Sequence, residues 1–447
     1  MAILRQKRFH PARVLAASFL AAILVGTILL LLPVSTVSKK IGLVDALFTA
    51  TSAVCVTGLV VVDTATYFTR FGQIVILCLI QLGGLGIMTF STMILLAAGR
   101  RISFQDRILV QESFLPAAPK DFRTLIRNVF IMTGLIEIAG ASLLFIRFSQ
   151  LFPWPTALFN SLFHSITAFC NAGFSTFSQN FKGFTGDILV NLTIIGLIIL
   201  GGLGFLVVQE MFYFSLLAKG KRSFHFSLHS KLVLSLTASL IIFPFLLFFW
   251  LEKSSGLGSV GWKEKILASL FQVVTPRTAG FNTIDLQSLR TASVFLLIGL
   301  MFVGASPGST GGGIKTVTVG VVLAFLRSKL MAREKVNVFY RTIPAECLTR
   351  AFTLIFLALS WIALASFLLL AAQPGAMMKE VLFEVFSAFG TVGLSLGITP
   401  ELTSLGKIIV VVTMYVGRIG PLTLLVAFSR AKSWGHFEYV EETVMIG

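Results

Sequence analysis

Four short segments of the chain share one pattern, and each ends in a glycine that Leu or Phe follows. Glycine adopts positive φ readily, and a chain needs this freedom to turn several carbonyl oxygens toward one axis. Four such segments around an axis form a ring of oxygens that can replace the hydration shell of a monovalent cation. The segments, each preceded by its first residue number, are 48 FTATSAVCVTGL, 163 FHSITAFCNAGF, 270 LFQVVTPRTAGF and 383 FEVFSAFGTVGL.

The alternative interpretation is that each final glycine only closes a turn or a tight helix contact. One isolated glycine fits that alternative better, but four in register favour a filter. Their spacing is regular, at 115, 107 and 113 residues. We therefore predict a cation filter that consists of the last three residues before each Leu or Phe: Val56, Thr57, Gly58, Asn171, Ala172, Gly173, Thr278, Ala279, Gly280, Thr391, Val392 and Gly393.

Long apolar runs lie on both sides of every filter segment and are long enough to cross a bilayer. The runs before the segments are Val14–Val34, Asn128–Ile146, Leu232–Leu251 and Ala351–Met378. Those after them are Phe71–Gly99, Ile188–Gln209, Thr291–Ile314 and Ile408–Ser429. The filter segments are too short to span, and we expect them to enter and leave on one face.

The predicted fold is therefore an all-α integral membrane protein with four repeats around one central pore. Each repeat has an outer helix, a pore helix, a filter loop and an inner helix, which gives eight spans and four re-entrant segments. The predicted pore repeats are 14–98, 125–218, 230–326 and 350–430, followed by a cytoplasmic C-terminal tail over 431–447.

Composition supports a membrane location and argues against other classes of protein. Hydrophobic residues make up 56% of the 447, and charged residues only 12%, against about 25% in soluble domains. The four cysteines are scattered, and no His, Cys or Asp cluster has catalytic or metal-ligating spacing. We predict no enzymatic activity, no cofactor and no metal site beyond the monovalent cation.

The formal net charge of +17 reflects topology. Of the 36 lysines and arginines, 22 lie in the termini and the loops between repeats, and 12 lie on the opposite face. The positive-inside rule therefore places both termini in the cytoplasm. Attraction to anionic lipid is an expected consequence of this bias, and we predict no nucleic-acid partner.

The predicted inner spans carry glycines near their centres. In the first two, GGLG at 83–86 and at 201–204 is interpreted as helix packing through small residues. The third is exceptional, because the glycines and the proline of 304–313 cannot sustain a regular helix. We expect this inner span alone to be broken, and we predict a gate there: Gly304, Ser306, Gly308, Ser309, Thr310, Gly311, Gly312 and Gly313, with Lys315 and Arg418.

Two of these gate residues have an alternative interpretation. Arg418 lies inside the last span, where a charged side chain is a functional candidate. It could instead be the structural partner of a carboxylate such as Glu137 or Glu210, and Glu137 itself is interpreted as a packing residue. Lys315 could extend along the helix toward the cytoplasm. The glycines before Lys315 resemble a nucleotide-binding P-loop, but Ile314 interrupts that motif and no βαβ unit surrounds it.

VCVTGLV at 54–60, CNAGF at 170–174, RTAGF at 277–281 and TVGL at 391–394 resemble the four filter segments of the Trk/Ktr/HKT superfamily of K⁺ transporters. The similarity extends over nearly the whole chain. It is strongest to the KtrB-type membrane subunits, because Trk-type relatives carry extra N-terminal spans before the first repeat and this sequence begins directly with that repeat. It implies K⁺ uptake across the bacterial plasma membrane and a gating loop at 304–313. A serine at the first filter glycine accompanies Na⁺ transport in this superfamily, so Gly58 implies K⁺ selectivity.

The same resemblance implies two partners, a second copy of this chain and a separate cytosolic ring of KtrA-type nucleotide-binding subunits. Activation of K⁺ uptake by Na⁺ is an alternative that the sequence leaves open. The alternative function is a secondary transporter that couples K⁺ and Na⁺ movement. Such transporters usually place ionisable groups near the bilayer midplane, where Arg418 is the clear candidate here.

Overall fold

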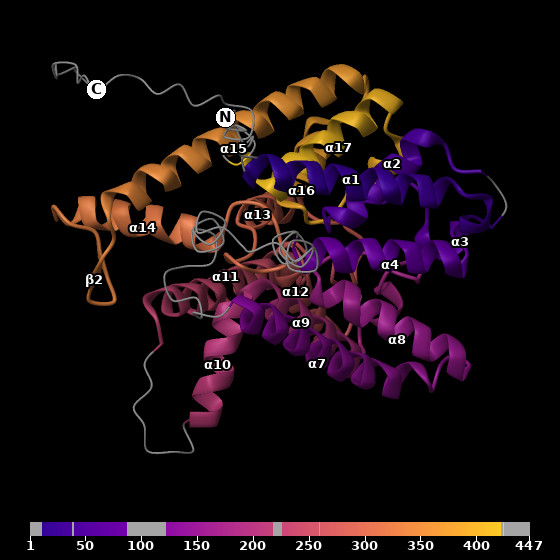
Figure 1. Cartoon of the computed structure of the whole chain (residues 1–447), viewed down its shortest axis with the longest axis horizontal. Coiled ribbons are helices and arrows are strands. Elements are labelled where there is room, and N and C mark those ends of the chain that lie inside the picture. The colour runs from indigo at the N-terminus through magenta and orange to yellow at the C-terminus, as the bar shows by residue number, and fades with distance from the viewer. Residues whose placement is uncertain are drawn as a thin grey trace, which may run out of the picture.

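A computed structural model describes residues 11–37, 40–86, 122–217, 226–258, 260–421 and 423. Within these residues the protein is mostly helical, and its strands form one short hairpin (Figure 1). The predicted tail at 431–447 and the parts of the first and last repeats at 87–98 and 424–430 lie outside the described residues. The repeat boundaries remain predictions.

Each repeat contributes one outer, one pore and one inner helix. The outer helices are α1 (Pro11–Leu31), α7 (Phe122–Phe148), α11 (Leu228–Glu252) and α15 (Ala345–Ala372). The pore helices are α2 (Leu43–Val54), α8 (Trp154–Phe169), α12 (Trp262–Val274) and α16 (Met378–Gly390). The inner helices are α4 (Arg70–Gly84), α9 (Ile188–Leu203), α13 (Thr291–Phe302) and α17 (Ser404–Ile419).

The remaining elements are short or follow the inner helices. They are α3 (Thr64–Tyr67), α10 (Phe205–Leu217), α14 (Thr316–Leu330), the 3-10 turns η1 (Pro33–Ser35), η2 (Lys182–Phe184) and η3 (Thr399–Glu401), and strands β1 (Asn337–Val338) and β2 (Arg341–Thr342). The strands form an antiparallel hairpin after α14, which the all-α prediction omitted. Each strand has only 2 residues, whereas the alternation of apolar and polar side chains indicates a half-buried strand only over about 4–8 residues.

The repeats pack in sequence and close into a ring. Inner helix α4 packs on pore helix α8, α9 on α12, α13 on α16, and α17 returns to α2. An ion pair of 2.6 Å between Lys407 Nζ and Asp45 Oδ1 joins the fourth repeat to the first. A second, between Lys182 and Asp285 at 3.2 Å, joins the second repeat to the third. This closure places all four pore helices around one axis.

The outer helices form the lipid-facing surface. Each is long and apolar enough to cross a membrane, by length and composition. Their outward side chains include exposed Ile28, Ile138, Phe243 and Phe356. Water would solvate such side chains poorly, whereas hydrocarbon accommodates them.

The inner spans differ from their prediction. Only the third was expected to break, but in each inner span a helix ends at a residue or segment with positive φ: Gly86, Gly204, the 303–315 segment and Gly420. At Gly204, α9 and α10 meet at a bend of 107°. Positive φ is incompatible with a right-handed helix, so these glycines end it. The expectation that 188–209 is an unbroken span is therefore wrong.

Candidate cation filter and gate

The four filter segments adopt the same unusual backbone. The final glycines all have positive φ, at 90° for Gly58, 69° for Gly173, 75° for Gly280 and 93° for Gly393. The residue two positions earlier also has positive φ in every repeat, and these residues are Val56, Asn171, Thr278 and Thr391. For a residue with a Cβ this conformation costs about 1–2 kcal/mol. Fourfold repetition of a costly conformation indicates a site that the surrounding structure holds in place.

The filter glycines lie against one another in a closed ring. A Cβ added to Gly58 would collide with the Ala172 carbonyl oxygen, and one on Gly173 would lie 2.8 Å from the Ala279 oxygen. Likewise a Cβ on Gly280 would collide with the Val392 oxygen, and one on Gly393 with the Thr57 oxygen. Each repeat thus contacts the next, and the fourth contacts the first. Only backbone atoms fit where the four filter glycines meet.

Hydroxyl groups of the pore helices fasten the filter loops. Ser52 Oγ accepts from the Gly58 amide at 3.0 Å and donates to the Leu59 carbonyl at 2.8 Å. In the third repeat Thr275 Oγ1 donates to the Phe281 carbonyl at 2.6 Å, and in the fourth Ser387 Oγ accepts from Gly393 at 3.1 Å. The sequence prediction missed these three residues. A signal was present, because every segment carries Ser or Thr five or six positions before its glycine.

Ser52→Ala is expected to lower the stability of the filter. The change leaves the buried Gly58 amide and Leu59 carbonyl without their partner, at a cost of about 1–3 kcal/mol. The thermal midpoint and the K⁺ over Na⁺ preference should both fall. Ser269→Ala is the matched control, because the Ser269 hydroxyl is buried in pore helix α12 without a hydrogen-bond partner. Equal losses in both variants would contradict this fastening role.

The inner-helix glycines serve close packing, as interpreted from the sequence for the first two inner spans, and Gly417 of the fourth does the same. A Cβ on Gly83 would collide with the Val54 carbonyl, one on Gly201 with the Phe169 carbonyl, and one on Gly417 with the Phe389 carbonyl. Each of these carbonyls lies four residues before a filter glycine. The inner helices thus support the C-terminal ends of the pore helices.

The 304–313 segment lies directly against the filter. Ala305, Ser306 and Thr310 are completely buried. The Gly312 amide donates to Thr391 Oγ1 at 3.2 Å, and a Cβ on Gly311 would collide with Thr278 Oγ1. Both threonines are predicted filter residues. The segment therefore lies where a loop could block the pore next to the filter.

This segment, residues 304–313, is the candidate gate and is called the gate loop below; the second repeat also holds it. Thr310 Oγ1 donates to the Phe169 and Gly201 carbonyls at 3.2 and 3.1 Å, and its amide bonds to Gly201 at 3.2 Å. The Ser306 amide donates to the Gly202 carbonyl at 3.0 Å. Together with Thr278 and Thr391, these contacts link the loop to three repeats.

Arg418 supplies the link to the first repeat. Its guanidinium donates to the Thr310 carbonyl of the gate loop and to the Gly83 carbonyl of α4. It therefore joins the gate loop to repeats one and four.

Neither suggested carboxylate is the partner of Arg418. Glu137 accepts from Gln81 Nε2 at 3.1 Å, in a packing contact between α7 and α4, and Glu210 accepts from the Ser227 amide at 3.2 Å. The alternative in which Arg418 pairs with Glu137 or Glu210 is therefore wrong. Lys315 does not extend toward the cytoplasm either, because its Nζ donates to the Gly311 carbonyl at 2.6 Å, back into the loop.

Comparisons with known proteins agree with this architecture. Residues 7–436 match the family model of TrkH, described as a cation transport protein. The chain is 41% identical over its full length to the Ktr system potassium uptake protein B of Bacillus subtilis (strain 168), of which it covers 98%. It is 39% identical to the protein of that name from Vibrio alginolyticus, over 97% of this chain and 94% of that one.

Two further similarities extend the comparison. The potassium/sodium uptake protein NtpJ of Enterococcus hirae is 37% identical over 99% of this chain and 98% of its own length. The crystal structure of the potassium transporter TrkH from Vibrio parahaemolyticus superimposes with a TM-score of 0.76, at 19% identity, over 95% of this chain and 86% of that one. The structural similarity extends the shared fold to nearly all of the chain. The family match and the relatives show that this chain belongs to the TrkH family of cation transport proteins.

Proposed function

We propose that this chain is the channel-like, ion-translocating subunit of a K⁺ uptake system. The observation that carries the proposal is the closed ring of four filter glycines, each in contact with the next repeat. A cation that passes through such a ring meets backbone oxygens in place of its hydration water. The names of the relatives from Bacillus subtilis and Vibrio alginolyticus, potassium uptake proteins, support K⁺ as the transported ion.

The gate loop gives the pore a regulated state. Its contacts with the second repeat, with Thr278 and with Thr391, and its link to the first repeat through Arg418, support a closed arrangement. Its small residues allow it to move at low steric cost. A cytosolic ring of nucleotide-binding subunits would favour the open arrangement only if it bound that arrangement more tightly. The word "system" in the relatives' names supports such a multi-component assembly, with this chain as its membrane subunit. A homodimer and cytoplasmic termini in the bacterial plasma membrane complete the proposal.

Growth complementation tests this function. The chain is expressed in cells that lack their own K⁺ uptake, with and without a cytosolic nucleotide-binding partner. We expect growth at low external K⁺ with the partner and weaker growth without it. No K⁺ uptake under either condition, with the protein present in the membrane, would contradict the proposal and indicate a structural subunit.

The second candidate is a transporter that couples K⁺ and Na⁺ movement. The name of the Enterococcus hirae relative, a potassium/sodium uptake protein, is the observation that favours it. Coupling needs a site that binds the second ion, and the glycine ring offers backbone oxygens to either ion. In this case K⁺ flux into vesicles should depend on a Na⁺ gradient, whereas a channel-like pore requires none.

Arg418→Ala is expected to raise basal K⁺ flux. The side chain donates to one carbonyl of the gate loop and one of α4, and charged hydrogen bonds of this kind contribute about 1.5–3 kcal/mol each. Loss of one such bond corresponds to an increase of roughly 10-fold or more in the open population. Partner-free ⁸⁶Rb⁺ uptake into vesicles measures it.

Arg418→Lys separates two causes of this effect. Lysine retains the positive charge but lacks the planar fork that reaches two carbonyls at once. If the hydrogen-bonded link holds the gate, the lysine variant should also leak. A stable Arg418→Ala protein without any gain in flux would contradict the role in the gate.

A further inference from the structure

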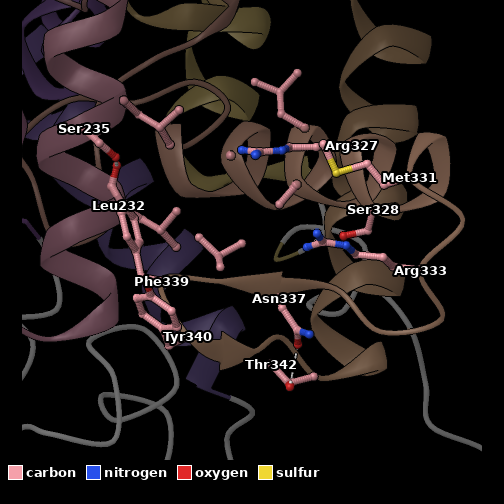
Figure 2. A pocket seen from close by; sticks show the side chains of 15 residues that line it. Leu232, Ser235, Arg327, Ser328, Met331, Arg333, Asn337, Phe339, Tyr340 and Thr342 are labelled. Carbon is pink, nitrogen blue, oxygen red and sulfur yellow. Dashed lines mark hydrogen bonds between the residues drawn. The ribbon is translucent and has the colours of Figure 1, made fainter.

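A groove of about 920 Å³ lies far from the filter, between the N-terminal half of α11, the C-terminal half of α14 and the β1–β2 hairpin. Figure 2 shows Arg327 and Arg333 extending toward it from the end of α14, with Leu232, Phe339 and Tyr340 on the other side. Its size is at the upper end of the range for small-molecule sites. Neither the filter nor the gate uses this groove.

The groove is basic at the end where α14 finishes. Arg327 and Arg333 both line it, and within the described residues neither guanidinium group forms an ion pair or a hydrogen bond. Lys329, Lys335 and Arg341 lie nearby in sequence, and Glu334 is the single acid between 327 and 342. Two arginines with free guanidinium groups are suited to a phosphate, which they can bind bidentately.

The part of the groove between α11 and α14 is largely apolar, although Ser235 also lines it, and Asn337 and Thr342 of the hairpin add polar groups. Leu232 and Leu236 of α11 face Leu323 and Ala324 of α14 across it. Two further large apolar side chains of α14, Leu326 and Leu330, are exposed and do not line the groove, and Leu330 is 89% exposed. Such side chains indicate a surface in contact with hydrocarbon, and arginines at the end of the helix then lie at headgroup depth. The groove therefore offers positive charge where a phospholipid has its phosphate and apolar surface where it has its acyl chains.

We propose that this groove binds one anionic phospholipid, with its phosphate on Arg327 and Arg333 and an acyl chain along the apolar cleft between α11 and α14. A free phosphate would leave the apolar part of the groove unused. A protein segment is disfavoured because the walls continue into the lipid-facing surface of α14. The lipid would lie on the helix that follows the gate loop after Lys315.

The test measures lipid retention by the full-length protein. Protein is purified from phosphatidylcholine vesicles that contain phosphatidylglycerol, and native mass spectrometry counts the phosphatidylglycerol that remains bound. The double variant Arg327→Gln, Arg333→Gln should bind phosphatidylglycerol about 30-fold more weakly, since each basic residue near an anionic surface contributes about a factor of 5. Lys335→Gln, Arg341→Gln is the matched control, because it removes the same charge from residues that do not line the groove.

A second variant tests the acyl-chain part separately. Ala324→Trp fills the cleft while both arginines remain, and it should also reduce retention of phosphatidylglycerol. Equal losses of bound phosphatidylglycerol in the two double variants would show that retention depends only on net positive charge. Displacement of the lipid by inorganic phosphate would identify a phosphate site. Wild-type retention in both groove variants, with loss of binding to a cytosolic partner protein, would make the groove a protein-docking surface. Each of these three results would overturn the proposal.

Discussion

Deletion of Ser309–Gly312 is expected to give high K⁺ flux that no longer depends on a cytosolic partner. The deletion removes the Thr310 contacts with the second repeat, the Gly312 contact with Thr391 and the carbonyl that accepts from Arg418. These contacts comprise five hydrogen bonds. At about 1 kcal/mol for each net hydrogen bond, the loss of even three of them favours the open state by roughly 100-fold. Partner-free ⁸⁶Rb⁺ uptake into vesicles measures the change.

Selectivity should be largely retained in this deletion. The glycine ring keeps the hydroxyl groups of Ser52, Thr275 and Ser387, none of which belongs to the loop. Ser309→Ala is the matched control, because the Ser309 hydroxyl is buried without a partner and its removal breaks no bond. Loss of K⁺ preference in the deletion would mean that the loop forms part of the filter. Unchanged, partner-dependent flux would show that the loop is no gate.

Gly58→Ser is expected to reduce the preference for K⁺ over Na⁺ about 10-fold or more. The added Cβ would collide with the Ala172 carbonyl oxygen, and φ of 90° is unfavourable for any residue with a side chain. The strain of about 1–2 kcal/mol per residue is enough to displace the neighbouring filter oxygens. Reversal potentials with K⁺ on one side and Na⁺ on the other measure the change.

Gly196→Ser is the control for Gly58→Ser. Gly196 lies in inner helix α9, and a Cβ at this position meets open space. This variant should keep wild-type selectivity, and both proteins should reach the membrane in similar amounts. Unchanged selectivity in Gly58→Ser would mean that the first filter segment is assigned in the wrong register.

Much of the architecture could be predicted from the sequence because it repeats. One glycine with positive φ is ambiguous, but four at similar spacing restrict the interpretation to segments around an axis. Apolar runs of sufficient length located the outer helices well, since Leu232–Leu251 falls within α11 and Asn128–Ile146 within α7. The positions of the pore helices followed from the same register.

Tertiary contacts could not be predicted in the same way. Apolar composition of 188–209 indicated one span, yet a single backbone angle at Gly204 bends it by 107°. Arg418 stays a predicted gate residue. Its acceptors are two backbone carbonyls, and every residue has a carbonyl, so the sequence could not indicate which ones it would contact. The groove beside α14 likewise depends on how a short hairpin folds back, which no periodicity indicates.

The proposed function has K⁺ passing through one pore formed by four repeats, without coupling to a second ion. The most direct test is the reversal potential of the reconstituted wild-type protein at several K⁺ gradients, with Na⁺ varied independently. A channel-like pore predicts a reversal potential that follows the K⁺ gradient and hardly changes with the Na⁺ gradient. A reversal potential that shifts in fixed proportion to both gradients would contradict a channel-like pore and establish coupled transport.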